Sequence, residues 1–257
     1  MIPNAKMFQL AIKFTKFAFE KKSRLIEKML FIIVLYLLKI FMKKPYIIFK
    51  FLDGTYFLLF NVSDFISAGL NNEPETFKFI MKQIKNCKVF VDVGANIGGY
   101  AIRAAKYCKV YAFEPLSRNY KILKINEKLN NVKIISFNIA AGNKNEKVKL
   151  YYTQGNWDEP SIKHEQNYFV EVEMKPLDEI INEESIDLIK IDVEGVEDLV
   201  LEGARNLLNR TKMIIIEKNK ESFSNAYKIL KEEGFRPKEI LDRCNILFIK
   251  NENIEIY

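Results

Sequence analysis

From Lys88 onward, short runs of apolar residues alternate with stretches in which apolar residues recur every three or four positions. The runs are typical of buried strands and the stretches of amphipathic helices, so the alternation predicts βαβ units and a largely parallel sheet. The predicted strands are Lys88–Val93, Lys109–Phe113, Val132–Phe137, Ile186–Ile191, Lys212–Glu217, Phe235–Leu241 and Ile246–Ile249. The last two are separated by residues 242–245, which predicts a terminal hairpin whose strands run antiparallel to the rest.

The helical period is clearest after Gly195. One apolar face there comprises Val196, Leu199, Val200, Gly203, Ala204, Leu207 and Leu208. Upstream of the sheet, residues 46–60 form two β-rich runs around Asp53-Gly54, a dipeptide that favours a tight hairpin turn. We therefore expect a helix after the fourth strand of the main domain and a small hairpin before its first.

The N-terminal segment has a different pattern. Six apolar residues recur at helical spacing among lysines, which predicts a basic amphipathic helix: Met7, Leu10, Ala11, Phe14, Phe17 and Ala18. Met29–Leu38 follows without a charge and extends to Met42 only by including Lys39. A spanning helix needs about 20 apolar residues, so a transmembrane anchor is the less favoured interpretation. Attachment to a membrane surface and packing against the main domain remain open.

These patterns divide the chain into three parts. Residues 1–44 form a basic amphipathic and hydrophobic helical segment, 45–87 a β-hairpin and helical connector, and 88–257 the main α/β domain. Residues 1–50 hold 11 Lys and Arg against two Asp and Glu, whereas the remaining 207 residues hold 29 against 31. The basic segment is thus expected to be attracted to an anionic surface, either phospholipid or nucleic acid.

Composition excludes several classes of protein. The 257 residues are 49% hydrophobic and 28% charged, which excludes disordered and fibrous chains. Three distant cysteines and a single histidine exclude a disulfide framework and His-rich zinc sites, so chemistry depends on carboxylates, Lys, Tyr or a cofactor. The cysteine usage indicates a reducing compartment, and we expect a cytoplasmic protein, peripheral on the inner face of the cell membrane if residues 1–44 bind lipid.

The ends of the first two strands of the main domain carry a candidate ligand site. Asp92 closes the first strand, Gly94 makes the turn, Asn96 tolerates positive φ, and Gly98 lets the following helix pack close to a ligand. Glu114 ends the second strand 20 residues after Gly94, the spacing at which a carboxylate accepts ribose hydroxyls. The two features together indicate a ligand that contains adenosine.

The loop sequence favours one such ligand. The dinucleotide fingerprint G-x-G-x-x-G needs a middle glycine, and Asn96 stands at that place. Asp92 would also repel a pyrophosphate, whereas it suits the ammonium and sulfonium groups of S-adenosyl-L-methionine. The sequence therefore predicts S-adenosyl-L-methionine as cofactor.

The fourth strand of this domain leads to a candidate catalytic group. Alternation places Lys190, Asp192 and Glu194 on one face if strand geometry persists that far. The hypothesis is that Asp192 or Glu194 orients or deprotonates an acceptor hydroxyl while Lys190 neutralises one carboxylate. The alternative is that both carboxylates cap the helix that begins near Gly195.

Glu217 ends the fifth strand and is a further acidic candidate. A divalent ion between Asp192, Glu194 and Glu217 is conceivable, but no ligand spacing demands it, so we expect no metal. The stretch Thr153–Asn167 breaks the α/β rhythm and holds Trp157 and His164. It is interpreted as an irregular connection, either a solvated loop or a lid over the acceptor.

Three motifs carry a family resemblance: DVGANIG at Asp92–Gly98, AFEP at Ala112–Pro115 and LIKIDVEGVEDLVLEGA at Leu188–Ala204. Together they resemble the FkbM-type family of S-adenosylmethionine-dependent methyltransferases. The resemblance implies a class I methyltransferase fold, a Rossmann-like seven-stranded sheet with a reversed last strand. It also implies methyl transfer to oxygen, often a hydroxyl of a sugar or a natural product. The cofactor-binding residues that it implies are Asp92, Gly94, Ala95, Asn96, Gly98, Glu114, Pro115 and Asn138.

The leading interpretation is an O-methyltransferase acting on a glycan, a lipid-linked sugar or a small metabolite, with residues 1–44 at a membrane surface. One alternative is an RNA methyltransferase whose basic N-terminal helices bind phosphates, although the apolar content of that segment suits lipid better. Another is a non-catalytic cofactor-binding protein. Base methylation of DNA is disfavoured because the Asn-Pro-Pro-aromatic motif is absent from the sequence. The acceptor and the oligomeric state are left open.

Overall fold

The structure is a computed structural model that describes residues 46–69, 73–153, 156–163, 168–219 and 222–250. The predicted amphipathic helix and apolar run within residues 1–44 lie outside this part of the chain. None of the helices within the described residues combines the length and the apolar composition that a membrane span requires.

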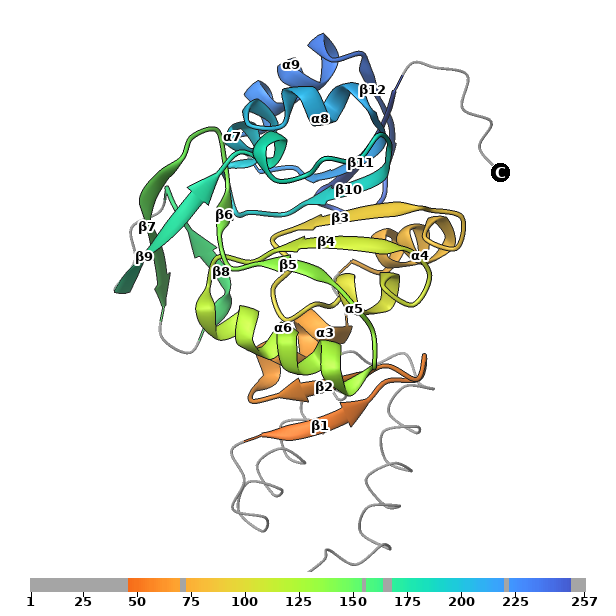
Figure 1. Cartoon of the computed structure of the whole chain (residues 1–257), viewed down its shortest axis with the longest axis vertical. Helices are drawn as coiled ribbons and strands as arrows, with labels where there is room; N and C mark the ends of the chain where they lie inside the picture. The colour runs from red at the N-terminus through yellow and green to blue at the C-terminus, as the bar shows by residue number, and fades with distance from the viewer. Residues whose placement is uncertain (1–45, 70–72, 154–155, 164–167, 220–221, 251–257) are drawn as a thin grey trace, which may run out of the picture.

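A seven-stranded, mostly parallel sheet forms the centre of the molecule, as predicted (Figure 1). Its strands in spatial order are β12 (Phe235–Ile240), β13 (Asn245–Lys250), β11 (Thr211–Glu217), β10 (Ile186–Ile191), β3 (Val89–Val93), β4 (Lys109–Phe113) and β5 (Ile135–Phe137). Four strands differ from their predicted bounds by no more than one residue at either end, and β4 and β10 match their predicted bounds at both ends. Only β5 is clearly shorter, because it begins at Ile135.

The terminal hairpin is present, but the prediction that both of its strands oppose the sheet is wrong. β13 pairs antiparallel with both β11 and β12, so β12 runs in the same direction as β11. A hairpin makes its two strands opposite to each other, and β13 lies between β12 and the rest of the sheet. Only β13 is therefore reversed.

Side chains alternate between the two faces of the sheet and form a core on each. Leu188 and Ile215 belong to one cluster, while Ile189 and Ile214 belong to the other. The first face is covered by α5 (Ala101–Ala104) and α6 (Ser117–Leu129), the second by α7 (Glu197–Glu202), α8 (Arg205–Asn209) and α9 (Phe223–Glu232). Figure 1 shows these two helical layers on opposite sides of the strands.

The apolar face predicted after Gly195 is divided between two helices, α7 and α8. A Cβ on Gly203 would lie 1.8 Å from the carbonyl oxygen of Gly142, so the backbone approaches a neighbouring loop at this point. The carbonyl of Gly203 also accepts a bond from the backbone N–H of Asp178, at the short helix η1 (Leu177–Glu179), rather than continuing a helix. Tertiary packing thus interrupts a pattern that is continuous in the sequence.

The connector begins with the predicted hairpin, β1 (Ile47–Lys50) and β2 (Tyr56–Leu59), followed by α3 (Val62–Gly69) and α4 (Pro74–Gln83). Its buried residues Phe57 and Ile80 share one core with Phe90 of β3. The hairpin turn is attached to α5 because the Arg103 guanidinium forms an ion pair with Asp53. The boundary at residue 88 stays a prediction, but the segments on either side of it pack as one body around this core.

A second sheet covers the sequence between β5 and β10. Its order is β6 (Ala140–Ala141), β9 (Tyr168–Lys175), β7 (Glu146–Thr153) and β8 (Asn156–Ser161). The prediction of an irregular connection over Thr153–Asn167 is therefore wrong for residues 156–161. Among the described strands β8 pairs with β7 alone, and an edge strand needs no alternating apolar pattern and tolerates a proline such as Pro160. The side chain of Trp157 and the whole of His164 lie outside the described residues.

Candidate functional site

A cavity of 760 Å³ opens where β3, β4, β10 and β11 end at their carboxyl termini, the edge at which open α/β sheets bind ligands. Ten of the residues singled out in the sequence line it: Asp92, Gly94, Ala95, Asn96, Glu114, Pro115, Lys190, Asp192, Glu194 and Glu217. Gly98 and Asn138 do not line it. The structure thus brings together the strand-end residues from four separate stretches of the chain.

The glycine loop after β3 requires its glycines for different reasons. Gly94 has φ of 85°, and a Cβ there would lie 1.8 Å from the carbonyl oxygen of Asp192. Gly98 has φ of 93°, and its Cβ would lie 2.9 Å from Ile102 in α5. Gly94 therefore allows two strand ends to meet at the cavity, whereas Gly98 allows helix packing behind it. Asn96 also has a positive φ, 49°, as expected.

Glu114 is buried at the end of β4 with both carboxylate oxygens hydrogen-bonded to the loops. The backbone N–H of Asn96 donates to Oε2 and that of Leu116 to Oε1, each at 2.8 Å. Burial raises the pKa of Glu114 to about 7, although these two bonds favour the charged form. Each oxygen retains a lone pair that can accept a ligand hydroxyl.

Asn138 contributes to this region without reaching the cavity wall. Its Nδ2 donates to the carbonyl oxygens of Glu114 and Pro115, both at 2.8 Å, and its Oδ1 accepts from the Ser117 hydroxyl at 2.8 Å. The side chain therefore holds the loop after β4 in place. Asn138 therefore supports Glu114 from behind the cavity wall and does not line the cavity.

Lys190 and Asp92 face each other across the β10–β3 pair, and both are buried. Lys190 Nζ donates to Asp192 Oδ2 at 2.6 Å. Burial alone would lower the pKa of Lys190, but the carboxylates of Asp192, Glu73 and Asp92 together raise it. Burial raises the pKa of Asp92 to about 7 against the attraction of Lys190. A buried ammonium is thus surrounded by more carboxylates than it can neutralise.

The predicted shared face holds for Lys190 and Asp192 but not as a strand pattern for Glu194. β10 ends at Ile191, and Glu194 has φ of 57°, in the left-handed region. The N-cap position that the capping alternative requires is not held by either carboxylate, because α7 begins at Glu197 with Val196 as its N-cap. Both carboxylates line the cavity instead.

Asp192, Glu194 and Glu217 form an acidic triad whose carboxylate oxygens lie within 4.8 Å of one another. Burial raises the pKa of Glu217 to about 9, and the nearby charges of Asp192 and Glu194 add to the increase. Three carboxylates offer the oxygen donors that a hard divalent cation needs. Lys190, bonded to Asp192, already supplies one positive charge to this group.

Sequence reasoning missed the cavity residues that the connector and the last hairpin contribute. Glu73 Oε2 lies 3.8 Å from Lys190 Nζ, and Asn245 Nδ2 donates to the same oxygen at 2.7 Å. The ring of Tyr100 lies against Lys190, with Nζ 5.0 Å from its centroid. The only signal for Glu73 is the Glu-Pro pair at a helix start, which by itself predicts an N-cap.

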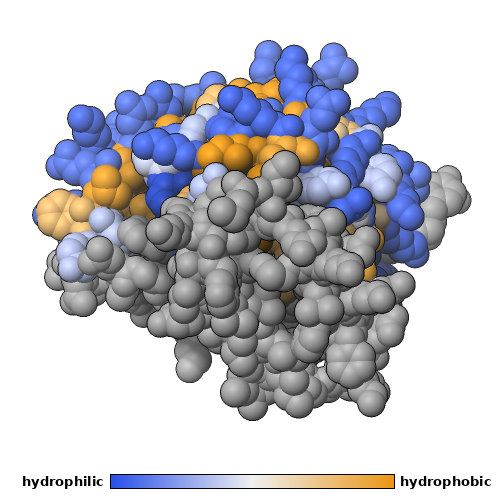
Figure 2. Space-filling view, turned by 90° about the horizontal axis from the view of Figure 1, so that it is seen from below, coloured by the Kyte–Doolittle hydropathy of each residue, from blue (hydrophilic) through white to orange (hydrophobic). Residues whose placement is uncertain are grey.

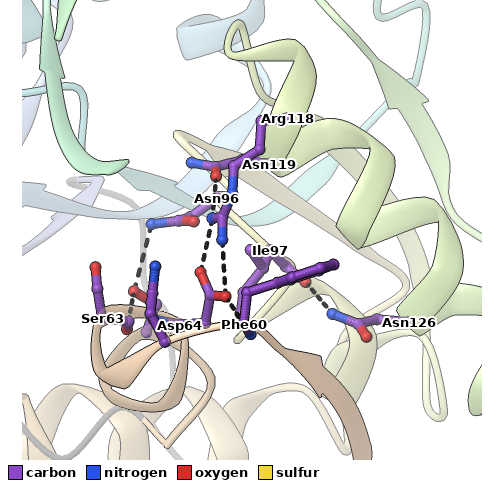
Figure 3. Close-up of polar contacts among 10 residues, drawn as sticks. Phe60, Ser63, Asp64, Asn96, Ile97, Arg118, Asn119 and Asn126 are labelled. Carbon is purple, nitrogen blue, oxygen red and sulfur yellow. Dashed lines mark hydrogen bonds and ion pairs between the residues drawn. The ribbon is translucent and has the colours of Figure 1, made fainter. Parts of the chain in front are cut away.

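A partly buried ion pair fixes the connector to the side of the site that carries the glycine loop after β3 (Figure 3). The two terminal nitrogens of the Arg118 guanidinium, Nη1 and Nη2, donate to Asp64 of α3 at 2.6 and 2.8 Å, and Asp64 is fully buried. Asn96 Nδ2 donates to the Ser67 hydroxyl of α3 at 3.4 Å. Helix α3 thus forms part of the cavity wall, with Ile66 and Ser67 lining it.

Comparison with known protein families identifies the family of this chain. A model described as "Methyltransferase FkbM domain" matches residues 92–237, more than half of the chain. No curated protein matches the sequence.

Solved structures of methyltransferases are similar in part. An FkbM methyltransferase from Methylobacillus flagellatus KT is 20% identical, with a TM-score of 0.45, over 63% of this chain and 43% of that one. The magnesium protoporphyrin IX methyltransferase of Synechocystis PCC 6803, with bound SAM, is 9% identical, with a TM-score of 0.45, over 73% and 81%. A Pyrococcus abyssi tRNA (uracil-54, C5)-methyltransferase in complex with S-adenosyl-L-homocysteine is 15% identical, with a TM-score of 0.46, over 80% and 44%. The chain thus covers less than half the length of the M. flagellatus protein.

Proposed function

The chain belongs to the FkbM methyltransferase family, and we propose that it transfers a methyl group from S-adenosyl-L-methionine to a hydroxyl of a sugar, a lipid-linked glycan or a small metabolite. The family confirms the predicted cofactor. The observation that carries the proposal is that one cavity unites the glycine loop, Glu114 and the carboxylates around Lys190. A cationic, ribose-containing methyl donor is complementary to such a site.

Each part of the cofactor has candidate partners among these residues. Glu114 would accept the ribose hydroxyls, since its bonds to two backbone N–H groups fix its orientation. Asp92 would hold the ammonium group, and the Gly94–Asn96 loop leaves room for the methionine chain. When bound, the cofactor supplies an electrophilic methyl group on a positively charged sulfur.

The chain's own residues would supply the acceptor side of the reaction. A hydroxyl that attacks a methyl group must lose its proton, and a positioned carboxylate can accept it. We assign this role to Asp192, because Lys190 holds its side chain at 2.6 Å beside the cavity. Glu217, whose pKa is raised to about 9, would carry a proton at neutral pH and could donate a hydrogen bond to the acceptor.

Calorimetry with the purified full chain tests the cofactor assignment. We expect heat of binding for S-adenosyl-L-methionine and S-adenosyl-L-homocysteine and none for NAD, with or without EDTA. Binding of NAD alone would refute the proposal. Methyl transfer that is lost in EDTA and restored by Mg²⁺ would show that the acidic triad works with a metal, against our expectation.

Cofactor affinity should depend on pH. The pKa values of Asp92 and Glu114 are raised to about 7 by burial, so both carboxyls are largely neutral below that pH in the ligand-free protein. A cationic ligand prefers their ionised forms, so its affinity should rise with pH, by about tenfold between pH 6 and 7.5. Dissociation constants measured by calorimetry over this range check the prediction. A constant or falling affinity would contradict it.

The class of acceptor can be identified with a labelled methyl donor. Native and delipidated membrane extracts are incubated with the protein, and the labelled products are separated. We expect label in carbohydrate-containing material or in a small hydroxylated metabolite. Label confined to RNA would favour the alternative in which the basic N-terminal segment binds phosphates.

We also propose that residues 1–44 attach the protein to an anionic membrane surface. The basic excess of the chain lies in its first 50 residues. The hairpin that follows exposes apolar side chains, among them Ile48 (48% exposed) and Leu52 (76% exposed). Figure 2 shows apolar surface among hydrophilic residues on this underside of the molecule. Flotation of the full chain with anionic vesicles but not with zwitterionic ones would support this attachment. Failure to float with either kind of vesicle would refute it.

A further inference from the structure

Glu73 occupies a helix-capping position but does not cap its helix. It is the N-cap residue of α4, and its side chain makes no capping bond. The carboxylate of Asp242, from the turn between β12 and β13, takes that place. It accepts from the backbone N–H of Thr76 at 2.8 Å and from that of Glu75 at 3.4 Å. The first turn of α4 is thus satisfied without the side chain of Glu73.

The side chain of Glu73 instead extends to the cavity wall. Its Oε2 accepts a hydrogen bond from Asn245 Nδ2 at 2.7 Å and lies 3.8 Å from Lys190 Nζ. Asn245 is buried and lies opposite Glu217 in the β13–β11 register, so both side chains project from the same face of the sheet. Two elements far apart in the sequence therefore hold this carboxylate beside Lys190.

The position of Glu73 determines the charge balance of the buried group. Lys190 has a side chain that is only 3% exposed, so solvent contributes little to its neutralisation. Asp192 alone would balance its charge. Asp92 and Glu73 are additional carboxylates whose charges also act on the ammonium, so in their ionised forms the three carboxylates outnumber the one positive charge. Buried charges are screened weakly, so adding or removing one carboxylate changes the electrostatic energy of a charged ligand in the cavity.

We propose that Glu73 is a positioning residue of the methyl-transfer site, which shares Lys190 with Asp192 and thereby keeps the cavity negative for a cationic cofactor. The inference rests on the proposed function. Without Glu73, Asp192 and Asp92 would remain beside Lys190, and the cavity would be less negative toward the sulfonium. The side chain thus favours the positively charged donor over its neutral product, S-adenosyl-L-homocysteine.

The test compares these two ligands on Glu73→Gln at pH 8, above the pKa of about 7 to which burial raises Asp92. Glutamine can still accept the bond from Asn245, but it carries no charge. We expect the ratio of affinities, S-adenosyl-L-methionine to S-adenosyl-L-homocysteine, to fall about tenfold, while binding of the homocysteine product changes less than about twofold. The matched control is Glu75→Gln, in the same helical turn, with a side chain that is 59% exposed. Its ratio should equal that of the wild type.

A second variant keeps the proposal testable if Glu73→Gln does not fold. Asn245→Ala retains the charge but removes the bond that anchors it, and the ratio should fall in the same direction by a smaller factor. Thermal unfolding followed by circular dichroism establishes that each variant is folded. A wild-type ratio in every folded variant would overturn the role of Glu73. If the wild type itself bound neither ligand, the proposed function would fail instead.

Discussion

Replacing Gly94 by alanine should abolish cofactor binding and reduce the free energy of unfolding by about 3 kcal/mol. The residue has φ of 85°, which costs an alanine roughly 1–2 kcal/mol, and the new Cβ would lie 1.8 Å from the carbonyl oxygen of Asp192. That backbone cannot move freely, because the N–H of Asp192 donates to the carbonyl of Val93 at 3.0 Å. The ends of β3 and β10 would have to separate, and the carboxylates on either side of the loop would move with them.

Urea unfolding and calorimetry with S-adenosyl-L-methionine measure these two effects. Gly234→Ala is the matched control, since Gly234 has φ of 82° and no atom within 4 Å of the added Cβ. It should cost only the backbone component, about 1–2 kcal/mol, and leave binding intact. If Gly94→Ala were no more destabilising than the control and still bound the cofactor, the close approach of the two strands would not be essential to the site.

Asp192→Asn should lower kcat by about 10²- to 10⁴-fold, the usual contribution of a positioned general base. Asparagine can still accept the hydrogen bond of Lys190, but it cannot accept a proton from the acceptor hydroxyl. Glu194→Gln should reduce kcat less than about tenfold. Glu194 follows the end of β10, where its backbone has left the strand conformation and is not aligned with Lys190.

Both variants are assayed by transfer of a labelled methyl group at saturating cofactor, so that weaker cofactor binding does not lower the measured rate. Dissociation constants are measured in parallel. Unchanged kcat in both would dismiss a proton-accepting role for these carboxylates. A larger loss of kcat in Glu194→Gln than in Asp192→Asn would assign the role of general base to Glu194 instead.

Strands were predicted correctly where their burial leaves a clear pattern in the local sequence. β4 and β10 begin and end where the apolar runs predict, because strands buried on both faces are continuous hydrophobic runs. β8 was missed, because an edge strand that pairs on one side needs no such pattern. The direction of β12 was also missed. It depends on the insertion of β13 between β11 and β12, which no local pattern records.

The candidate site divides in the same way. Asp92 and Glu114 follow buried strands directly, and the ends of neighbouring parallel strands meet at one edge, so their proximity could be predicted. Glu73 and Asn245 could not be found, because 172 residues separate them in the chain and each has an ordinary local explanation. Whether Asn138 would touch the cavity or support Glu114 likewise required the placement of its side chain.

The amino-acid order alone determined the parallel sheet, the glycine turn and the strand-end carboxylates, since strand burial and turn chemistry act over a few neighbouring residues. Only the tertiary structure decided which charges share Lys190, because electrostatic partners are selected by distance in space. A helix start and a distant hairpin meet there, and their side chains set the balance of a buried ammonium.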